Sequence, residues 1–456
     1  MKHFEVIIIG TGQAGPSLAA RCASEGLKTA IVEKGNFGGT CVNTGCIPTK
    51  TLVASAKMAF MARRAADFGV QIDGQISVDM KQVKARKDSI VEQSNTGVEK
   101  WLRSTKNLTV FEGHARFESS HTIQVGDEIL RGDKIFINVG GRAYIPDGFE
   151  DVDFLTNVEM MNIDFIPDHL IIVGGSYIGL EFGQMYKRFG SKVTIVEKGC
   201  KLVSREDDDV SEEIKKIMEA EGIKFRFEAE CLSGSQNGNQ VLINADCDKG
   251  DKTITGSHLL LATGRQPNTD DLGLENTGIE TNARGYIQVN DKLQTNIPGI
   301  WALGDCNGKG AFTHTAYNDF EIVAANLFDN DPRKVSDRIT CYGLFIDPAL
   351  GRVGLTENEI KKSGRKALIG TRTMKRIGRA KEKGETNGFI KILVDAETQK
   401  ILGAAILGIE GDEIIHSILD CMYAGASYTV IQRAVHIHPT VSELIPTVLG
   451  ELKPLN

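Results

Sequence analysis

Hydrophobic and polar positions along this chain follow a pattern that occurs twice. The first copy begins with the apolar run VIIIG at residues 6–10, continues through the turn GTGQAG and the amphipathic stretch SLAARCASEG, and ends in KTAIVEK at residues 28–34. The second begins with HLIIVGG at residues 169–175 and ends in KVTIVEK at residues 192–198. Each copy predicts a βαβ unit. Two such units indicate two nucleotide sites.

The rest of the chain shows two further patterns. Residues 51–105 are mainly helical in pattern, residues 106–142 read as short strands, and GIWALGDCNG at residues 299–308 resumes the style of the first unit. From about Ser336, several strands precede helices that continue to the C-terminus. We therefore expect an α/β protein with two Rossmann-like dinucleotide-binding domains, the second inserted in the first, and a C-terminal α+β domain. The expected segments are 1–145 and 266–335 for the first domain, 146–265 for the inserted domain and 336–456 for the last.

Composition excludes several classes of function. The 456 residues are 41% hydrophobic and 25% charged, with a net charge of -7, so neither nucleic acid nor an anionic membrane is an expected partner. No apolar run approaches 18 residues and no leader precedes the first strand, so a cytoplasmic protein is expected. Nine cysteines, an odd number, argue against a secreted disulfide framework.

The first turn has the residues of a dinucleotide site. Gly10, Gly12 and Gly15 give G-x-G-x-x-G directly after a strand, and Glu33 closes the next strand. The glycines allow a tight turn, the approach of a pyrophosphate and close packing of the helix, whose N-terminus then meets the negative charge. Glu33 would accept hydrogen bonds from an adenosine ribose.

The second turn is less regular. Gly174 and Gly179 occupy the first and last positions, but Ser176 stands in the middle one, and Glu197 again closes the next strand. An acidic residue there favours a free 2′-hydroxyl and repels a 2′-phosphate, so NADH is expected to be preferred over NADPH. The nearby cations that weaken this preference, and leave NADPH as an alternative, are Lys198, Lys201 and Arg205.

Two cysteines lie five positions apart in the stretch GGTCVNTGCIPTK, as Cys41 and Cys46. In an ideal helix such residues point about 140° apart, so they can bond only where the segment is distorted, and Asn43 and Gly45 tolerate distortion. A disulfide closing so short a loop gains only about 2 kcal/mol from chain entropy, so it would be easily reduced. Redox catalysis is favoured over a structural role for these cysteines. One alternative is that both thiols are buried and form no bond with each other.

A histidine and a carboxylate stand together near the C-terminus. His438 precedes a proline in HIHPTVSE, and Glu443 follows five residues later. A carboxylate that reaches the imidazole selects its tautomer and stabilises its cation, and such a pair can serve a thiol as base and acid. One alternative is that His438 is an ordinary surface or core histidine whose ring nitrogens are hydrogen-bonded and which takes no part in catalysis. The other is zinc bound by His436, His438 and the two thiolates, although C-x4-C is not the usual spacing.

Five motifs carry a resemblance to a known family. GGTCVNTGCIPTK, GGSYIGLEFG, ATGRQPNT, WALGD and HIHPTVSE occur in the order found in the class I pyridine nucleotide-disulfide oxidoreductases, which include lipoamide dehydrogenase, glutathione reductase and mercuric reductase. The resemblance covers essentially the whole chain. It implies a homodimer that holds FAD in the first domain and a nicotinamide cofactor in the inserted one, with the last domain at the interface.

The resemblance also implies roles for individual residues. Cys46 matches the thiol that contacts the flavin, and Cys41 the thiol that exchanges with substrate. The base, His438, and its carboxylate would come from the opposite subunit. Lys50 and Glu181 resemble an ion pair beside the reactive edge of the isoalloxazine. The remaining positions that match cofactor contacts are Thr40, Ala115, Asp305 and His314 for FAD, together with Gly264.

The function that follows is an FAD-dependent NAD(P)H:disulfide or dithiol oxidoreductase. Electrons would pass from NAD(P)H through FAD to a disulfide between Cys41 and Cys46, and on to a small-molecule or protein disulfide or dithiol. No bound metal is expected. Alternatives are a reductase for Hg(II) or Cu(II), a flavin-based transhydrogenase or oxidase, and a redox-sensing or carrier-binding subunit.

Two features depart from the pattern of the family. FGGTCVNTGCIPTKTLVASA, AFTHTAYND and FIDPALGRVGLTE look most like mercuric reductase, yet the end of the chain, VLGELKPLN, has no cysteine pair. Without thiols there to relay a soft cation, efficient mercury reduction is not expected. Val139 and Gly141 also replace the usual threonine and serine at the end of one strand, which affects contacts at the domain junction.

Overall fold

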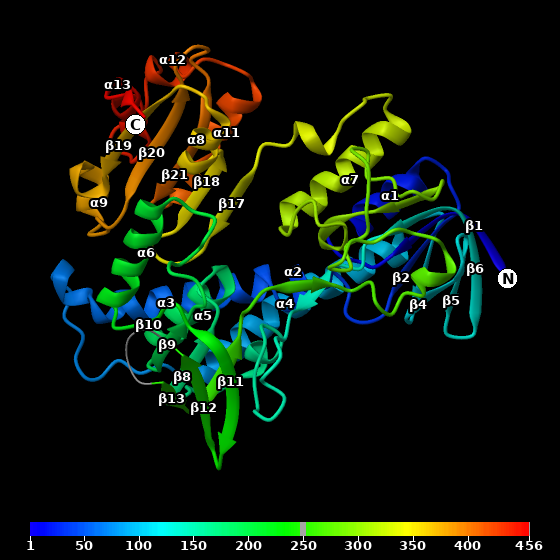
Figure 1. The fold of residues 1–456 in the computed structure, drawn as a ribbon, viewed down its shortest axis with the longest axis horizontal. Coiled ribbons are helices and arrows are strands. Elements are labelled where there is room, and N and C mark those ends of the chain that lie inside the picture. The colour runs from blue at the N-terminus through cyan, green and yellow to red at the C-terminus, as the bar shows by residue number, and fades with distance from the viewer. Residues whose placement is uncertain (247–251, 456) are drawn as a thin grey trace.

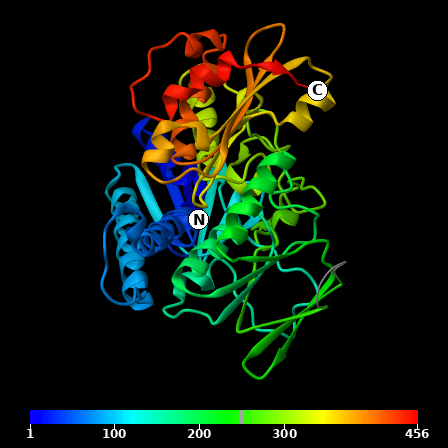
Figure 2. The ribbon, with the colours of Figure 1, turned by 90° about the vertical axis from the view of Figure 1, so that its left-hand side faces the viewer.

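The structure of the protein is a computed structural model that describes residues 1–246 and 252–455. Figure 1 shows the last part of the chain, in orange and red, gathered at one end of the molecule above α3 and α6, and Figure 2 shows the same division from the side. Within the described ranges, no helix combines the length and the apolar character needed to cross a bilayer.

The first βαβ unit lies in a mixed sheet with strand order β3-β2-β1-β6-β5-β4, in which β16 joins β6. The pairs β1 with β2, β2 with β3, β1 with β6 and β6 with β16 are parallel, whereas β4, β5 and β6 pair antiparallel. A strand that follows the second unit in sequence therefore completes the first sheet. The strands are β1 (Lys2–Ile9), β2 (Thr29–Glu33), β3 (Leu108–Glu112), β4 (Ala115–Ser119), β5 (Thr122–Val125), β6 (Glu128–Ile137) and β16 (Ile300–Ala302).

The apolar run of the first strand is buried on both faces, as parallel strands between covering layers require. Val6 and Ile8 pack on one side with Leu18 of α1 (Gly15–Ser24), whereas Ile7 and Ile9 pack on the other side. The helix begins at Gly15, directly before a proline whose fixed φ suits the first turn. The strand, turn and helix predicted from the sequence are thus present.

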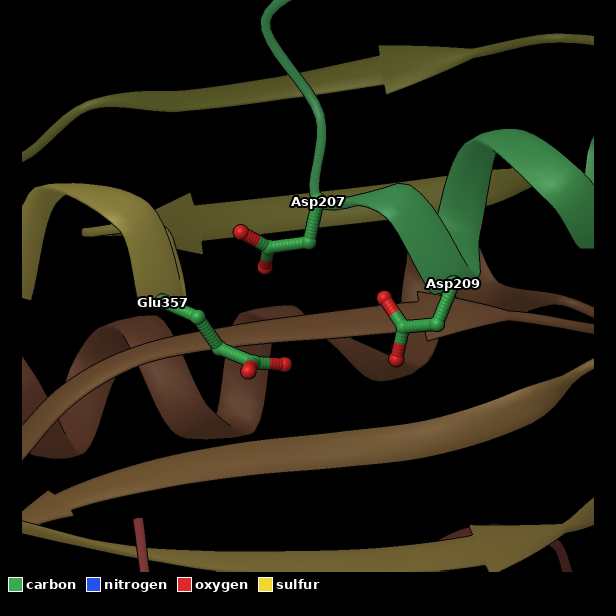
Figure 3. Close-up of side chains that lie close together, drawn as sticks. All are labelled: Asp207, Asp209 and Glu357. Atoms are coloured by element: carbon green, nitrogen blue, oxygen red, sulfur yellow. The ribbon is translucent and has the colours of Figure 1, made fainter. Parts of the chain in front are cut away.

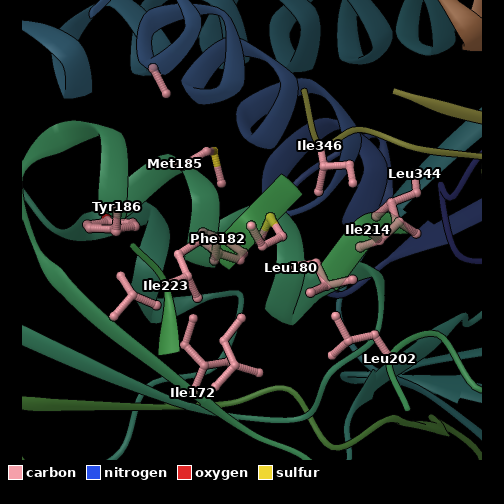
Figure 4. Close-up of a cluster of buried hydrophobic side chains, with 14 of the residues drawn as sticks. Ile172, Leu180, Phe182, Met185, Tyr186, Leu202, Ile214, Ile223, Leu344 and Ile346 are labelled. Atoms are coloured by element: carbon pink, nitrogen blue, oxygen red, sulfur yellow. The ribbon is translucent and has the colours of Figure 1, made fainter. Parts of the chain in front are cut away.

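The second unit forms a parallel sheet of order β10-β9-β8-β14. Its core contains Ile172, Leu180 and Phe182, and Leu344 and Ile346 from the C-terminal part join the same cluster (Figure 4). A hairpin sheet of β11, β12 and β13 lies beside it. The elements are β8 (His169–Val173), α5 (Tyr177–Phe189), β9 (Lys192–Val196), α6 (Asp208–Ala220), β10 (Lys224–Arg226), β11 (Glu230–Asn237), β12 (Gln240–Asp246), β13 (Thr253–Gly256) and β14 (His258–Leu261).

Residues 51–105, in the stretch between the two units, are mainly helical, as their sequence predicts. Asp79 caps the longest helix by accepting hydrogen bonds from the amides of Lys81 and Gln82. Helix α3 packs against both α4 and α5, which joins the first unit to the second. The elements are α2 (Gly39–Asn43), α3 (Cys46–Arg63), the 3-10 turn η1 (Ala65–Phe68) and α4 (Met80–Ser104).

The C-terminal part is an antiparallel sheet of order β17-β18-β21-β20-β19-β22 with short helices packed on it, which confirms the α+β expectation. The α/β fold class predicted for the whole chain is likewise confirmed. The elements are β17 (Cys341–Leu344), β18 (Leu350–Gly354), α8 (Glu357–Ser363), β19 (Ala367–Thr373), α9 (Gly378–Glu382), β20 (Phe389–Asp395), β21 (Ile401–Leu407), α10 (Gly411–Ile414), α11 (His416–Tyr423), α12 (Thr429–Gln432), α13 (Ile445–Gly450) and β22 (Lys453–Pro454).

The connection between the units is made by a small two-stranded sheet of β7 (Gly141–Ala143) and β15 (Arg265–Pro267). A Cβ on Gly141 would lie 2.8 Å from the carbonyl oxygen of Gln266. The glycine that replaces the usual serine therefore lets these strands approach closely. The junction forms in spite of the departure noted in the sequence.

Candidate active site

The two dinucleotide turns have the same construction. Gly10 and Gly174 end their strands with φ of 103° and 117°, a region that favours glycine. A Cβ on either would lie 2.4 Å or 2.3 Å from a carbonyl oxygen of the neighbouring strand. A Cβ on Gly15 or Gly179 would lie 2.2 Å or 2.0 Å from the carbonyl oxygen of the first glycine of its own turn. Both turns therefore require glycine at these positions, because the backbone of the following helix and of the adjacent strand packs directly against the turn.

The acidic residues at the ends of the second strands are also held alike. Oε2 of Glu33 accepts a hydrogen bond from the amide of Thr11 at 2.9 Å, and Oε2 of Glu197 accepts one from the amide of Gly175 at 2.6 Å. In each case Oε1 accepts a bond from the amide two residues further on, at 2.9 Å and 2.7 Å. The hydroxyl of Thr11 adds a third bond to Glu33. The two carboxylates are thus fixed beside their turns.

Asn138, which sequence reasoning did not select, holds the first turn together. It is buried at the end of β6, where its Oδ1 accepts from the amide of Gly15 and its Nδ2 donates to the carbonyl of Leu303, both at 3.0 Å. It also lies under Gly12, whose Cβ would be 3.1 Å from Oδ1. One amide side chain therefore ties the start of α1 to the ends of β6 and β16.

Asp305 and Ala115 lie around the first sheet, whereas Gly264 follows a strand of the second sheet. Asp305, just after β16, has Oδ2 at 3.5 Å from Nε of Arg265. Burial raises the pKa of the Asp305 carboxyl, and the arginine opposes that shift. Ala115 is buried at the start of β4. Gly264 follows β14 with φ of 130°, and the space where its Cβ would stand is open.

The two cysteines lie in separate helices. Helix α2 ends at Asn43, Thr44 and Gly45 break the helical path, and α3 begins at Cys46. The expected distortion is therefore confirmed. A Cβ on Gly45 would lie 2.8 Å from the carbonyl oxygen of Thr40, so a residue with a side chain would not allow the break as it stands. Both thiols are free and partly buried.

Three asparagine amides hold the chain around this break. Nδ2 of Asn43 donates to the carbonyls of Phe37 and Gly39, both at 2.9 Å. Nδ2 of Asn95, on α4, donates to the same Phe37 carbonyl at 2.8 Å and to Oδ1 of Asn43 at 3.0 Å. The third amide belongs to Asn157, in the segment before β8. Its Nδ2 donates to the carbonyl of Thr44, which lies between the two helices, at 2.9 Å.

The environment of Cys46 favours a thiolate. Its Sγ lies 3.0 Å from Oγ1 of Thr313, the first residue of α7 (Thr313–Phe328), and Cys46 itself begins α3, so two helix N-termini meet at this sulfur. A hydrogen bond from Cys41 is the largest cause that lowers the pKa of Cys46, to about 6, with help from Thr313 and Lys50 and against burial. The same bond raises the pKa of Cys41. The two shifts are opposite because one proton is shared between the thiols.

Lys50 and Glu181 form the expected ion pair. Nζ of Lys50, on α3, lies 2.7 Å from Oε2 of Glu181, on α5, and 4.4 Å from the ring centroid of Phe345. Oε1 of Glu181 accepts from the amide of Phe345 at 3.0 Å. Because Lys50 stands one helical turn after Cys46, the pair lies beside the thiols.

His314 follows Thr313 on α7, and its ring interacts with the start of β17. Its Nε2 is 2.8 Å from the carbonyl oxygen of Cys341, and its ring stacks on Phe312 with centroids 5.4 Å apart. Burial lowers the pKa of its imidazole, which favours a neutral ring that donates to this carbonyl.

His438 and Glu443 meet each other but not the cysteines of their own chain. Nδ1 of His438 lies 3.0 Å and 2.9 Å from the two carboxylate oxygens, and its side chain is 81% exposed. The nearby apolar side chains Val435 and Ile437 are also exposed. His436 interacts through Nδ1 with the carbonyl of Ala434, so the described part of one chain does not assemble the four zinc ligands considered above.

Thr313 was not selected from the sequence, although it lies in the motif AFTHTAYND, and it leads to a prediction. Replacing Thr313 by valine removes a hydrogen bond to the thiolate, so we expect the Cys46 pKa to rise by about one unit. The measurement is the pH dependence of alkylation of the reduced protein by iodoacetamide. Thr313→Ser keeps the hydroxyl and should titrate like the parent chain. Equal midpoints for the valine and serine variants would contradict the role of the hydroxyl.

Two dinucleotide turns and a thiol pair on one scaffold are the arrangement of a flavoprotein oxidoreductase. Residues 4–319 match the family described as pyridine nucleotide-disulphide oxidoreductase, and residues 341–449 match its dimerisation domain. The chain belongs to the pyridine nucleotide-disulfide oxidoreductase family. It is an enzyme that uses FAD and NAD(P)H to transfer electrons to or from disulfides, and it carries the dimerisation domain of the family.

Known relatives cover the chain from end to end. It is 34% identical to the "Probable pyridine nucleotide-disulfide oxidoreductase RclA" of Escherichia coli, over 99% of this chain and 100% of the relative. It is 33% identical to "Dihydrolipoyl dehydrogenase 3" of Haloarcula marismortui, over 97% of this chain and 94% of the relative. A solved structure, the Cu(II) complex of the HOCl-induced flavoprotein disulfide reductase RclA from Escherichia coli, superposes with a TM-score of 0.90 at 33% identity and 99% coverage of both chains.

The residues around the first turn suit FAD. Gly10 and Gly15 pack too closely against the backbone for side chains, Glu33 stands at the end of β2, and the half-buried Asp305 stands after β16. All lie at the carboxyl ends of parallel strands of one sheet, which is where such sheets bind dinucleotides. When bound, FAD supplies the hydride and electron chemistry that amino-acid side chains lack.

Proposed function

We propose that Cys41 and Cys46 form the redox-active disulfide of this enzyme. The observation that carries the proposal is the placement of Cys46 at two helix N-termini, 3.0 Å from the Thr313 hydroxyl and near the Lys50–Glu181 pair. We assign FAD to segments 1–145 and 266–335, the nicotinamide nucleotide to segment 146–265, and the subunit interface to segment 336–456.

The reaction of the thiols with a disulfide substrate is an exchange in two steps. The Cys41 thiolate attacks one sulfur of the substrate, which forms a mixed disulfide and releases the first thiol of the substrate. The Cys46 thiolate then attacks the sulfur of Cys41, which releases the second substrate thiol and closes the Cys41–Cys46 disulfide. Two electrons leave the dithiol, and two protons end on the released thiols. In reverse, the same steps oxidise a dithiol.

The raised pKa of Cys41 explains why this thiol needs a base. Within the pair the negative charge resides on Cys46, so Cys41 must lose its proton before it attacks. We assign this proton to Nε2 of His438, whose Nδ1 is held by Glu443. Since His438 is exposed and does not meet the cysteines of its own chain, we assign it to the site of the other subunit of a homodimer.

A thiol count tests the disulfide. The number of cysteines that react with an aromatic disulfide reagent under denaturing conditions should rise by about two per chain after anaerobic reduction by NADH, because the bridge opens. The flavin content should be measured on the same sample. An unchanged count in protein that carries FAD and oxidises NADH would contradict the proposal and favour an oxidase or transhydrogenase in which the thiols are secondary.

We propose NADH as the preferred nucleotide. Glu197 follows β9, at the position where an acidic residue repels a 2′-phosphate. Lys201 is not free to bind such a phosphate, because its Nζ lies 2.6 Å from Asp208 and 2.8 Å from the carbonyl oxygen of Glu206. Glu197→Gln should reduce the ratio of kcat/KM for NADH to that for NADPH by about tenfold. Steady-state rates with both nucleotides measure it. A parent enzyme that uses NADPH better than NADH would exclude this assignment.

The substrate is assigned only as a disulfide or a dithiol. A panel of lipoamide, glutathione disulfide, Hg(II), Cu(II) and quinones would rank the candidates. Cu(II) is included because the RclA structure is a Cu(II) complex. Since thiolates bind soft metals tightly, metal reduction and metal inhibition must be separated by measuring product as well as NADH consumption.

A further inference from the structure

Tyr342, on β17 of the C-terminal sheet, reaches the unit that carries the second dinucleotide turn. Its hydroxyl donates to Oε1 of Glu206 at 2.5 Å. Its ring meets Tyr177 edge to face with centroids 5.6 Å apart and stacks on Phe312 at 5.7 Å. Tyr177 follows the second turn directly, as the first residue of α5. One side chain of the C-terminal sheet therefore contacts both the residue after the turn and the segment after β9.

The hydrogen bond from Tyr342 stabilises a buried carboxyl group. Glu206 is 1% exposed, and no hydrogen bond from the described residues reaches its Oε2, which lies 3.7 Å from Nη1 of Arg352. Burial raises the pKa of Glu206, with Arg352 acting against that shift. Leaving a buried carboxyl without its hydrogen bond is costly, so removal of the Tyr342 hydroxyl should displace Glu206.

Glu206 anchors a strained loop that covers the second turn. Val203 is buried with φ of 45°, which is unfavourable for a β-branched residue. Its amide donates to the carbonyl of Gly175 at 3.0 Å, and its own carbonyl accepts from the amide of Glu206 at 2.7 Å. Such strain persists only where the surroundings hold it. The loop begins after Glu197, the proposed adenosine contact.

We propose that Tyr342 is a positioning residue for the nicotinamide nucleotide. Through Glu206 it holds residues 199–206 against the turn at Gly174 and Gly175, and through its ring it holds Tyr177. The nucleotide site of the inserted unit therefore also depends on a side chain from the C-terminal sheet. This inference rests on the proposed nucleotide site and extends it to a residue of another domain.

A neighbouring cluster of charged side chains also joins the second unit to the C-terminal sheet, and it does not involve Tyr342. Asp207, Asp209 and Glu357 converge, as Figure 3 shows, and Nζ of the buried Lys391 lies 3.0 Å, 2.7 Å and 2.6 Å from their oxygens. An ammonium group therefore stands among the three carboxylates, which join the start of α6 to α8 and β20. We expect this junction to survive loss of one tyrosine hydroxyl.

Calorimetric titration of the oxidised holoenzyme with NAD⁺ tests the inference. Tyr342→Phe should weaken NAD⁺ binding about tenfold and raise KM for NADH, whereas the rise in thiol count at saturating NADH should stay at two per chain. If Tyr342 only stabilised the fold, Tyr342→Phe would lower thermal stability but would not weaken NAD⁺ binding while leaving thiol reduction intact. NAD⁺ affinity within twofold of the parent value would overturn the inference.

Two further variants control for other effects. Tyr317→Phe removes the hydroxyl of an exposed tyrosine on α7 and should bind NAD⁺ like the parent enzyme. Glu206→Gln keeps an oxygen acceptor for Tyr342, so its affinity should stay within about threefold of the parent value. A loss as large as that of Tyr342→Phe would overturn the role of the hydrogen bond. If the parent enzyme itself failed to bind NAD⁺, the proposed nucleotide site, and not only this inference, would be wrong.

Discussion

Cys41→Ser is expected to lower the rate of disulfide turnover by about 1,000-fold or more, because the exchange then lacks its nucleophile. The variant should still bind FAD and accept electrons from NADH, since no residue of the dinucleotide turns is changed. Its Cys46 has no partner left to form a bridge, and Thr313 and Lys50 still lower the pKa of this thiol and favour the thiolate. A thiolate against bound flavin should give a long-wavelength absorbance band without any reductant.

The paired variant Cys46→Ser should also lack turnover but should not show this band. Cys421→Ser is the matched control, because Cys421 is a free thiol on α11, outside both dinucleotide turns, and its loss should change neither property. Stopped-flow rates with a small disulfide, together with visible spectra, are the measurements. Full turnover in Cys41→Ser would refute the assignment of the two roles.

His438→Ala is expected to lower disulfide turnover by about 100-fold or more, since general acid-base catalysis by one side chain contributes that much. NADH binding should be unchanged, because His438 is exposed, belongs to neither dinucleotide turn and, among the charged groups of the described residues, pairs only with Glu443. Glu443→Gln should have a smaller effect in the same direction, because the amide still orients the ring but does not stabilise its cation.

Subunit mixing tests where this histidine acts. Dimers that combine a Cys41→Ser chain with a His438→Ala chain contain one complete site if the histidine comes from the partner, and none if it acts within its own chain. Random mixing of equal amounts makes half of the dimers mixed, so about a quarter of the parent activity should return. No recovery in dimers shown to be mixed would place the histidine in its own chain.

Local sequence patterns predicted the parts of the site that are built from neighbouring residues. The glycine turns, Glu33 and Glu197 follow from strand, turn and helix signals within about 25 residues, and the His438–Glu443 contact joins residues five apart. The Lys50–Glu181 pair spans 131 residues and was reached only through the resemblance to a family.

The contacts that sequence reasoning missed connect distant segments. Thr313 meets Cys46 across 267 residues, Asn138 meets Gly15 across 123, and Tyr342 meets Glu206 across 136. Nothing near these residues in sequence indicates a partner, because a hydroxyl or an amide is satisfied equally well by water. Only the packing of strands and helices brings each group to its partner.

The break between α2 and α3 bears on how this enzyme changes between its oxidised and reduced forms. Asn43, Asn95 and Asn157 fix the peptide groups on both sides of the break, so making or breaking the sulfur bond requires only rotation of two side chains. We therefore expect the proposed redox cycle to proceed without rearrangement of the backbone at this break.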